Sequence, residues 1–261
     1  MDDRMRRQDA KAVLLAGLCL CAVALADGKP SPQDQQVGGG VPLLQGGARS
    51  TTEVDRTLAA ALQQTRVATA SVAVVRGAGP IYTRSVGART GPGAVPADDG
   101  TVFRAASLGK AVFAYLVFTL VGDGRLDLDR PLHEYLAKPL PDFPEYADLA
   151  GDSRYRAITA RLVLSHRTGF PNWRWQTRDK KLRLLFDPGE RFLYSGEGYR
   201  YLQFVVEQIT GKGLEALAHE RVFGPLGMTT TGYAWRERYA SNCAVDRAPI
   251  EKVFGPGFLS V

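Results

Sequence analysis

Apolar residues recur at the helical spacing between residues 51 and 67, and Ser50 stands before them as a helix start. This pattern predicts a helix over 51–67. Two runs rich in valine, isoleucine and tyrosine follow at residues 70–75 and 81–86, and the segment Gly-Ala-Gly-Pro separates them. Short β-branched runs on either side of such a turn are typical of a β-hairpin.

Further along, the stretch from Ser107 to about Val121 is apolar at nearly every position. A helix that is apolar all round is a buried helix, so we expect this one at the centre of the core. Residues 125–190 contain six prolines, which predict short helices and turns. Two more helices are expected at about 197–210 and 213–222.

The first 50 residues have a different character. Residues 1–26 combine basic residues, an apolar run and a small-x-small end, which is the pattern of a secretory signal peptide. Its removal would leave a secreted or periplasmic protein without a stable membrane span, and an uncleaved N-terminal anchor is the alternative. Residues 27–50, rich in glycine, proline and glutamine, predict a flexible leader, and 51–261 predict the folded domain.

Composition narrows the possible functions. The chain has 261 residues, 45% hydrophobic and 23% charged, which is typical of a soluble globular protein. Cys243 is the single cysteine after the signal, so we expect no internal disulfide. The histidines, His133, His166 and His219, show no paired spacing, and we expect neither a metal nor an organic cofactor. The net charge of +6 comes without a basic run or aromatic ladder, which argues against nucleic acid and fits an anionic surface such as a cell-wall polymer.

Ser107 and Lys110 are the first candidates for chemistry. Residues three apart lie on one face of a helix, so the serine hydroxyl and the lysine amine can meet. The pair opens the most apolar helix of the chain. A desolvated amine loses its proton more readily and can then accept the proton of a serine. A surface serine beside a lysine that extends into solvent is the alternative.

Tyr194 is the second candidate, in the segment Tyr194-Ser195-Gly196. A turn before it and a short apolar segment would project its hydroxyl into a cleft. A phenol near a cationic lysine can move a proton to a leaving group. A core tyrosine with a satisfied hydroxyl is the alternative.

The segment Phe103–Lys110 resembles the nucleophile segment of the serine β-lactamase and penicillin-binding-protein superfamily, in its class C-like branch. The resemblance covers about residues 52–235. Other segments match that branch in the same order: Gly124–Asp129, Leu162–Pro171, Asp187–Ser195, Gly198-Tyr199 and Phe223–Met228.

This resemblance implies an α/β fold of the α+β type, in which an antiparallel sheet is flanked by helices and lies beside a mostly helical region. It implies Ser107 as the acylated nucleophile, Lys110 as its proton acceptor and Tyr194 as the partner base or acid. The backbone N–H of Ser107 would donate to the oxyanion. His166 falls in a structural segment of the family. A Ser-His-Asp triad on it is conceivable, but the sequence has no Gly-x-Ser-x-Gly elbow.

The sequence departs from the family in two places. Gly196 stands where the second family motif usually has asparagine, so no side chain there can bind a substrate amide. The third motif, Lys-Thr/Ser-Gly or His-x-Gly on a late strand, does not follow Tyr194. We therefore expect a domain that is incomplete at its C-terminus, without the closing strands, from a truncated, frameshifted or incompletely assembled reading frame.

These observations predict an exported serine hydrolase that forms an acyl-enzyme with an ester, a β-lactam or a D-Ala-D-Ala-like substrate. Its partner would be a small molecule or a cell-wall peptide. A non-catalytic truncated remnant, or a cell-wall binding module of the same family, is the alternative that the missing third motif favours. An α/β-hydrolase would need alternating βαβ units, which the pattern lacks.

Overall fold

The computed structural model describes residues 40–77, 79–89 and 95–244. The predicted signal peptide and residues 27–39 of the predicted leader lie outside these residues. The chain divides into two compact units. Among the described residues, the first unit holds those up to Ala105 together with 226–231 and 235–244, and the second holds 106–225 with 232–234.

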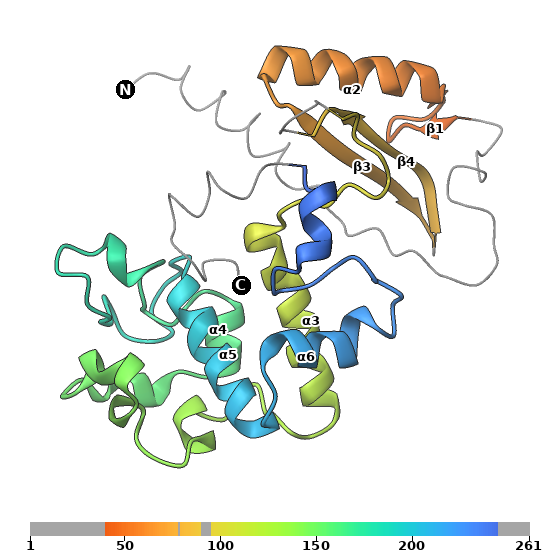
Figure 1. Ribbon diagram of the computed structural model, residues 1–261. Helices are drawn as coiled ribbons and strands as arrows, with labels where there is room; N and C mark the ends of the chain where they lie inside the picture. The colour runs from red at the N-terminus through yellow and green to blue at the C-terminus, as the bar shows by residue number, and fades with distance from the viewer. Residues whose placement is uncertain (1–39, 78, 90–94, 245–261) are drawn as a thin grey trace. The chain divides into compact units, whose positions relative to one another are not determined.

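The first unit is built on a helix and a hairpin. The helix α2 (Thr51–Thr65) lies along the antiparallel strands β3 (Thr69–Arg76) and β4 (Gly79–Gly87), as Figure 1 shows. Ser50 caps α2: its hydroxyl accepts the Glu53 N–H, and the Glu53 carboxylate accepts the Ser50 N–H. This reciprocal capping satisfies donors that a helix start otherwise leaves unpaired. The predicted helix and hairpin are confirmed.

Two further features belong to this unit. The Tyr82 hydroxyl on β4 donates to Asp55 Oδ1 at 2.6 Å and so ties the hairpin to α2. The short strands β1 (Val41–Pro42) and β2 (Ala48–Arg49) pair with each other, although they fall within the segment predicted to be a leader. Regular structure is therefore present within this predicted leader, at residues 41–49.

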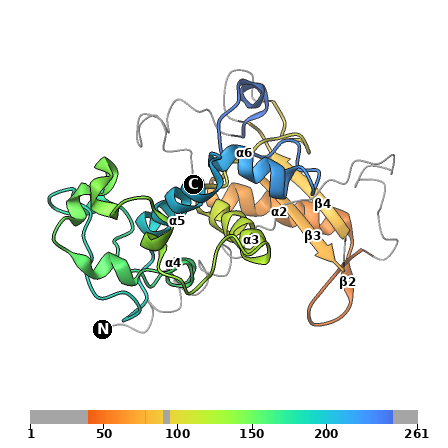
Figure 2. The same cartoon turned by 90° about the horizontal axis from the view of Figure 1, so that it is seen from below.

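The second unit is mostly helical, as predicted. Its central helix is α3 (Gly109–Gly122), and α4 (Ala160–Leu164) lies beside α5 (Gly196–Thr210) in both views (Figures 1 and 2). The helix α6 (Leu214–Ala218) continues into a π-helical turn, η8 (His219–Phe223). The remaining elements are short 3₁₀ turns: η2 (Ala106–Leu108), η3 (Leu132–Tyr135), η4 (Leu140–Asp142), η5 (Pro144–Leu149), η6 (Ser153–Ala157) and η7 (Arg174–Gln176), with η9 (Glu237–Asn242) in the first unit.

The core of the second unit takes side chains from α3, from α5 and from the turns between them, such as Tyr146 and Phe170. Phe113 is fully buried and its ring lies 6.1 Å from that of Tyr199. The prediction that α3 is buried all round is wrong, because Tyr115 and Phe118 are each 53% exposed. The helix buries one face against the core and leaves the other open. Among the described residues, no helix has the length and apolar composition that a membrane crossing requires.

Candidate active site

Ser107 and Lys110 meet at the start of α3. Ser107 is exposed on the 3₁₀ turn η2, whereas Lys110, in the first turn of α3, is only 5% exposed. The Lys110 Nζ donates a hydrogen bond to Ser107 Oγ at 3.3 Å. The sequence predicts that the α-helix begins at Ser107, whereas in the structure Ser107 lies in the 3₁₀ turn directly before α3. The side chains of Ser107 and Lys110 still come together.

The backbone before Ser107 is strained. Ala106 has a φ of +43°, in the left-handed region that a residue with a Cβ rarely adopts. Such a conformation costs on the order of 1–3 kcal/mol and persists only where the surrounding structure imposes it. The strained residue is the first of the turn η2 and directly precedes Ser107.

Three aromatic rings surround the amine of Lys110, and we call them the aromatic cage. The Nζ lies 5.8 Å from the ring centroid of Trp173, 5.5 Å from that of Tyr194 and 5.6 Å from that of Tyr199. Ring faces carry negative partial charge and attract a cation. The cage therefore holds the buried amine in place opposite Ser107.

Tyr194 lies directly before α5 and is 37% exposed, so it is not a core tyrosine. Its ring centroid lies 5.5 Å from Lys110 Nζ and 4.3 Å from the ring of His166, to which it is tilted by 31°. Ser107 and Tyr194 thus have the same neighbour, the amine of Lys110. The structure brings the three predicted site residues together around this one group.

His166 contacts the ring of Tyr194 and binds the backbone of the next residue. Its Nδ1 accepts the backbone N–H of Ser195 at 3.0 Å, and its ring also lies 5.1 Å from that of Tyr199. Burial and, secondarily, the nearby Lys110 cation lower the pKa of His166. The ring is therefore neutral near pH 7, and its Nδ1 is occupied by a backbone amide at the place where a triad aspartate would bind.

Trp173 is the site residue that sequence reasoning missed. A Cβ on Gly196 would lie 2.5 Å from Cη2 of Trp173, so the indole fills the space that a side chain at position 196 would take. The neighbouring Asn172 holds this segment at the start of α5. The Gly196 N–H donates both to the Asn172 carbonyl, at 3.0 Å, and to the Asn172 side-chain oxygen, at 3.1 Å. The run Asn-Trp-Arg-Trp after Pro171 was the available signal.

Arg174 anchors the same segment. Its backbone N–H and its Nε donate to Glu197 Oε1 at 2.8 and 3.0 Å, and its Nη2 donates to Oε2 at 2.8 Å. Glu197 is 1% exposed. A buried carboxylate requires such pairing, and the pair fixes the turn that carries Trp173 to the start of α5.

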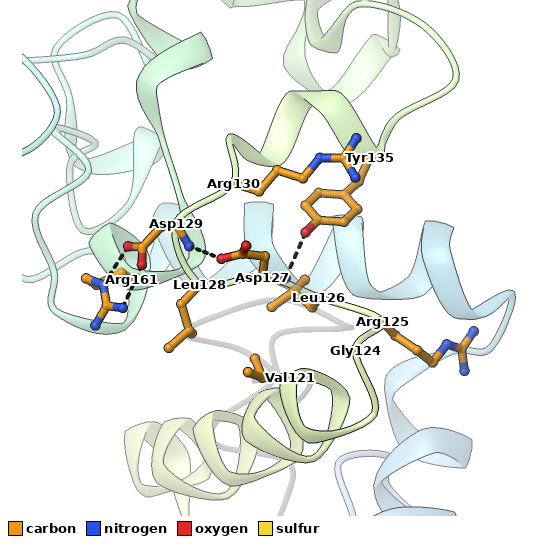
Figure 3. A pocket seen from close by; sticks show the side chains of 10 residues that line it. All are labelled: Val121, Gly124, Arg125, Leu126, Asp127, Leu128, Asp129, Arg130, Tyr135 and Arg161. Carbon is orange, nitrogen blue, oxygen red and sulfur yellow. Dashed lines mark hydrogen bonds and ion pairs between the residues drawn. The ribbon is translucent and has the colours of Figure 1, made fainter.

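A separate cavity of about 550 Å³ lies beside the turn after α3 (Figure 3). Its two carboxylates have partners within the lining: Arg161 binds both oxygens of Asp129, and the Asp127 carboxylate accepts the Asp129 N–H. The hydrogen bond from Arg161 lowers the pKa of Asp129. None of the predicted catalytic residues lines this cavity. Its polar groups serve the loop itself.

A metal site is not evident: among the described residues, no group of histidine, cysteine, aspartate and glutamate could hold an ion. The neighbour of Ser107 is a lysine, and the groups around that lysine are two phenols and an indole. These groups can move protons and bind apolar surface.

Comparison with known proteins identifies relatives of this arrangement. The chain is 28% identical over 221 residues to Esterase EstB of Burkholderia gladioli, which covers 74% of this chain and 54% of the esterase. It is 28% identical over 158 residues to a putative D-alanyl-D-alanine carboxypeptidase of Escherichia coli, which covers 52% of this chain and 35% of the relative. The chain thus spans about half the length, or less, of these curated relatives.

A solved structure described as a class C beta-lactamase superposes with a TM-score of 0.61 at 20% identity, and covers 74% of this chain and 53% of that one. At this identity the likeness concerns the fold, and the predicted fold class is confirmed. The Beta-lactamase family model matches residues 54–247. The chain therefore belongs to the beta-lactamase family.

Proposed function

We propose that this chain carries the acylating site of an exported serine hydrolase, with Ser107 as its nucleophile. The observation that carries the proposal is the bond of 3.3 Å between Lys110 Nζ and Ser107 Oγ, formed by a buried amine and an exposed hydroxyl. Membership of the beta-lactamase family and an esterase among the relatives support it. The signal-like pattern of residues 1–26 supports export.

In the proposed reaction, Ser107 Oγ attacks the carbonyl carbon of an ester, and its proton passes to the pair formed by Lys110 and Tyr194. The bond between that carbon and the leaving oxygen breaks, and the proton leaves with the alcohol. Water then attacks the acyl-serine ester and releases the acid, and a proton returns to Ser107. The backbone N–H of Ser107 donates to the oxyanion in both steps.

Esters are the substrate class that we propose first, before β-lactams and D-Ala-D-Ala-like peptides. Gly196 offers no side-chain donor or acceptor to a substrate amide. The space beside it is filled by the hydrocarbon of Trp173. An ester that acylates Ser107 needs no hydrogen bond from that position.

The test is release of nitrophenol from p-nitrophenyl acetate by the purified chain. Ser107→Ala is expected to lower kcat/KM by at least about 10³-fold. Ser153→Ala, a serine on the exposed turn η6, is the matched control and is expected to leave it unchanged. Hydrolysis that survives in Ser107→Ala would contradict Ser107 as the nucleophile. A folded protein without hydrolysis would contradict the proposal and favour the non-catalytic binding module.

A further inference from the structure

Trp173 occupies a distinct position in the site. Its ring centroid lies 5.8 Å from Lys110 Nζ, and that amine lies 3.3 Å from Ser107 Oγ. A group bound on the indole is thus separated from the reacting oxygen by one amine. We propose that Trp173 is a specificity-determining residue, whose indole binds a flat, apolar group of the substrate that acylates Ser107. This inference rests on the proposed function and names the substrate class of the same site.

The indole is one member of a stacked aromatic pair. The rings of Trp173 and Trp175 stack at 4.6 Å with an interplanar angle of 10°. Trp175 is 42% exposed. Aromatic groups prefer offset stacking or edge contacts with other rings, and such contacts add to the burial of area. Because Trp175 covers one face of the Trp173 ring, an aromatic substituent of a substrate would contact Trp173 at its ring edge while it also meets the exposed part of Trp175.

The pair is preorganised. Arg174, between the two tryptophans, makes three hydrogen bonds to the buried carboxylate of Glu197 and a fourth, of 2.7 Å, to the carbonyl of Glu145. Because these bonds fix the turn before substrate arrives, binding on the indole loses little conformational entropy. A fixed wall also discriminates between substrate shapes more strongly than a mobile side chain.

Glycine at position 196 is what admits the indole. A Cβ there would approach Cη2, Cζ2 and Cζ3 of Trp173 to 2.5, 2.6 and 2.8 Å. Two features therefore occur together: the loss of any polar side chain at position 196 and the presence of an apolar ring in its place. Both favour an ester with an aromatic substituent over a substrate that needs hydrogen bonds from that position.

The kinetic test compares methyl benzoate and phenyl acetate with methyl acetate, using acid release in a pH-stat. In Trp173→Ala, kcat/KM is expected to fall about tenfold more for the two aromatic esters than for methyl acetate. Trp173→Phe is expected to restore most of the difference. Gly196→Ala, which retains Trp173 but displaces it, is expected to resemble Trp173→Ala. An equal loss on all three esters would overturn the inference while leaving the proposed function intact.

A binding test separates the two hypotheses further. Ligand-observed NMR measures the binding of methyl benzoate and of methyl acetate to the Ser107→Ala protein, which cannot be acylated at that position. Saturation transfer to the ring protons of methyl benzoate is expected, with loss in the Ser107→Ala/Trp173→Ala double variant. Selective binding without turnover in the wild-type chain would refute the proposed function but retain the binding site. Equal binding by both variants would refute the site.

Discussion

Glu197 links the fold to the proposed site, and replacing it with glutamine gives a strong test of that link. In the native protein this carboxylate accepts three hydrogen bonds from Arg174 and is 1% exposed. Glu197→Gln keeps the shape and one accepting oxygen, but its amide group turns a donor toward the guanidinium. The variant thus leaves Arg174 with an unpaired positive charge in a half-buried place.

The magnitude follows from this geometry. Breaking a buried ion pair by removing one partner costs about 3–5 kcal/mol. The side chain of Arg174 is 22% exposed and also donates to the Glu145 carbonyl, so water and that carbonyl offset part of the loss. We expect a decrease of about 3 kcal/mol in the free energy of unfolding, at the low end of the range. For a chain of this size that lowers Tm by roughly 6–12 °C.

Urea unfolding followed by circular dichroism measures this change. Glu220→Gln is the matched control, because its ion pair with Lys212 is exposed and we expect no measurable change from its loss. The same Glu197→Gln protein is expected to lose selectivity for aromatic esters, since the turn with Trp173 is no longer fixed. A loss of less than about 1 kcal/mol would refute the reasoning, since that is what an exposed pair contributes.

Three further predictions concern the backbone and histidine of the site. Burial lowers the pKa of His166 below 6.5, so its contribution to stability is present above pH 6.5 and is lost as the pH falls from there toward the folded-state pKa. In His166→Asn, the plot of Tm against pH is therefore expected to be flatter between pH 5 and 7. An unchanged slope would contradict this. Ala106→Gly relieves the positive φ and is expected to stabilise the protein by up to about 1 kcal/mol while lowering the rate of acylation of Ser107, measured by stopped flow; faster acylation would show that the strain does not position the serine. Gly169→Ala is expected to lower the free energy of unfolding by more than about 3 kcal/mol, because its Cβ would lie 2.3 Å from a carbonyl oxygen. Gly124→Ala is the control: its Cβ would lie in open space, so only the positive φ is strained and the expected loss is about 1 kcal/mol. Equal losses, measured by denaturant unfolding, would contradict this.

Local features of the fold are predictable from the sequence because the interactions behind them are local. Ser50 and Glu53 cap α2 across three residues, and the hairpin of β3 and β4 closes over a short turn. The meeting of Ser107 and Lys110 is likewise a matter of helical spacing. In each case a few neighbouring residues determine the geometry, so pattern and spacing are sufficient.

Features that depend on residues far apart in the chain are not predictable in this way. Trp173 reaches Lys110 only because Asn172 and Arg174 bind the start of α5. The exposed face of α3 was missed for the same reason: Phe118 is as apolar as its buried neighbours, and only tertiary packing decides which face is covered. The pattern of apolar residues along a helix shows which residues it contains, whereas the elements packed against the helix determine which of its faces is buried.

The central claim is that Ser107 becomes acylated, and covalent labelling followed by peptide mapping tests it most directly. The purified chain is treated with a fluorophosphonate and, in parallel, with a fluorescent penicillin, and the adduct is located by mass spectrometry. The account predicts one fluorophosphonate adduct on the peptide that carries Ser107, and its loss in Ser107→Ala and Lys110→Ala. A folded protein that takes up neither label, or an adduct on another residue, would contradict it.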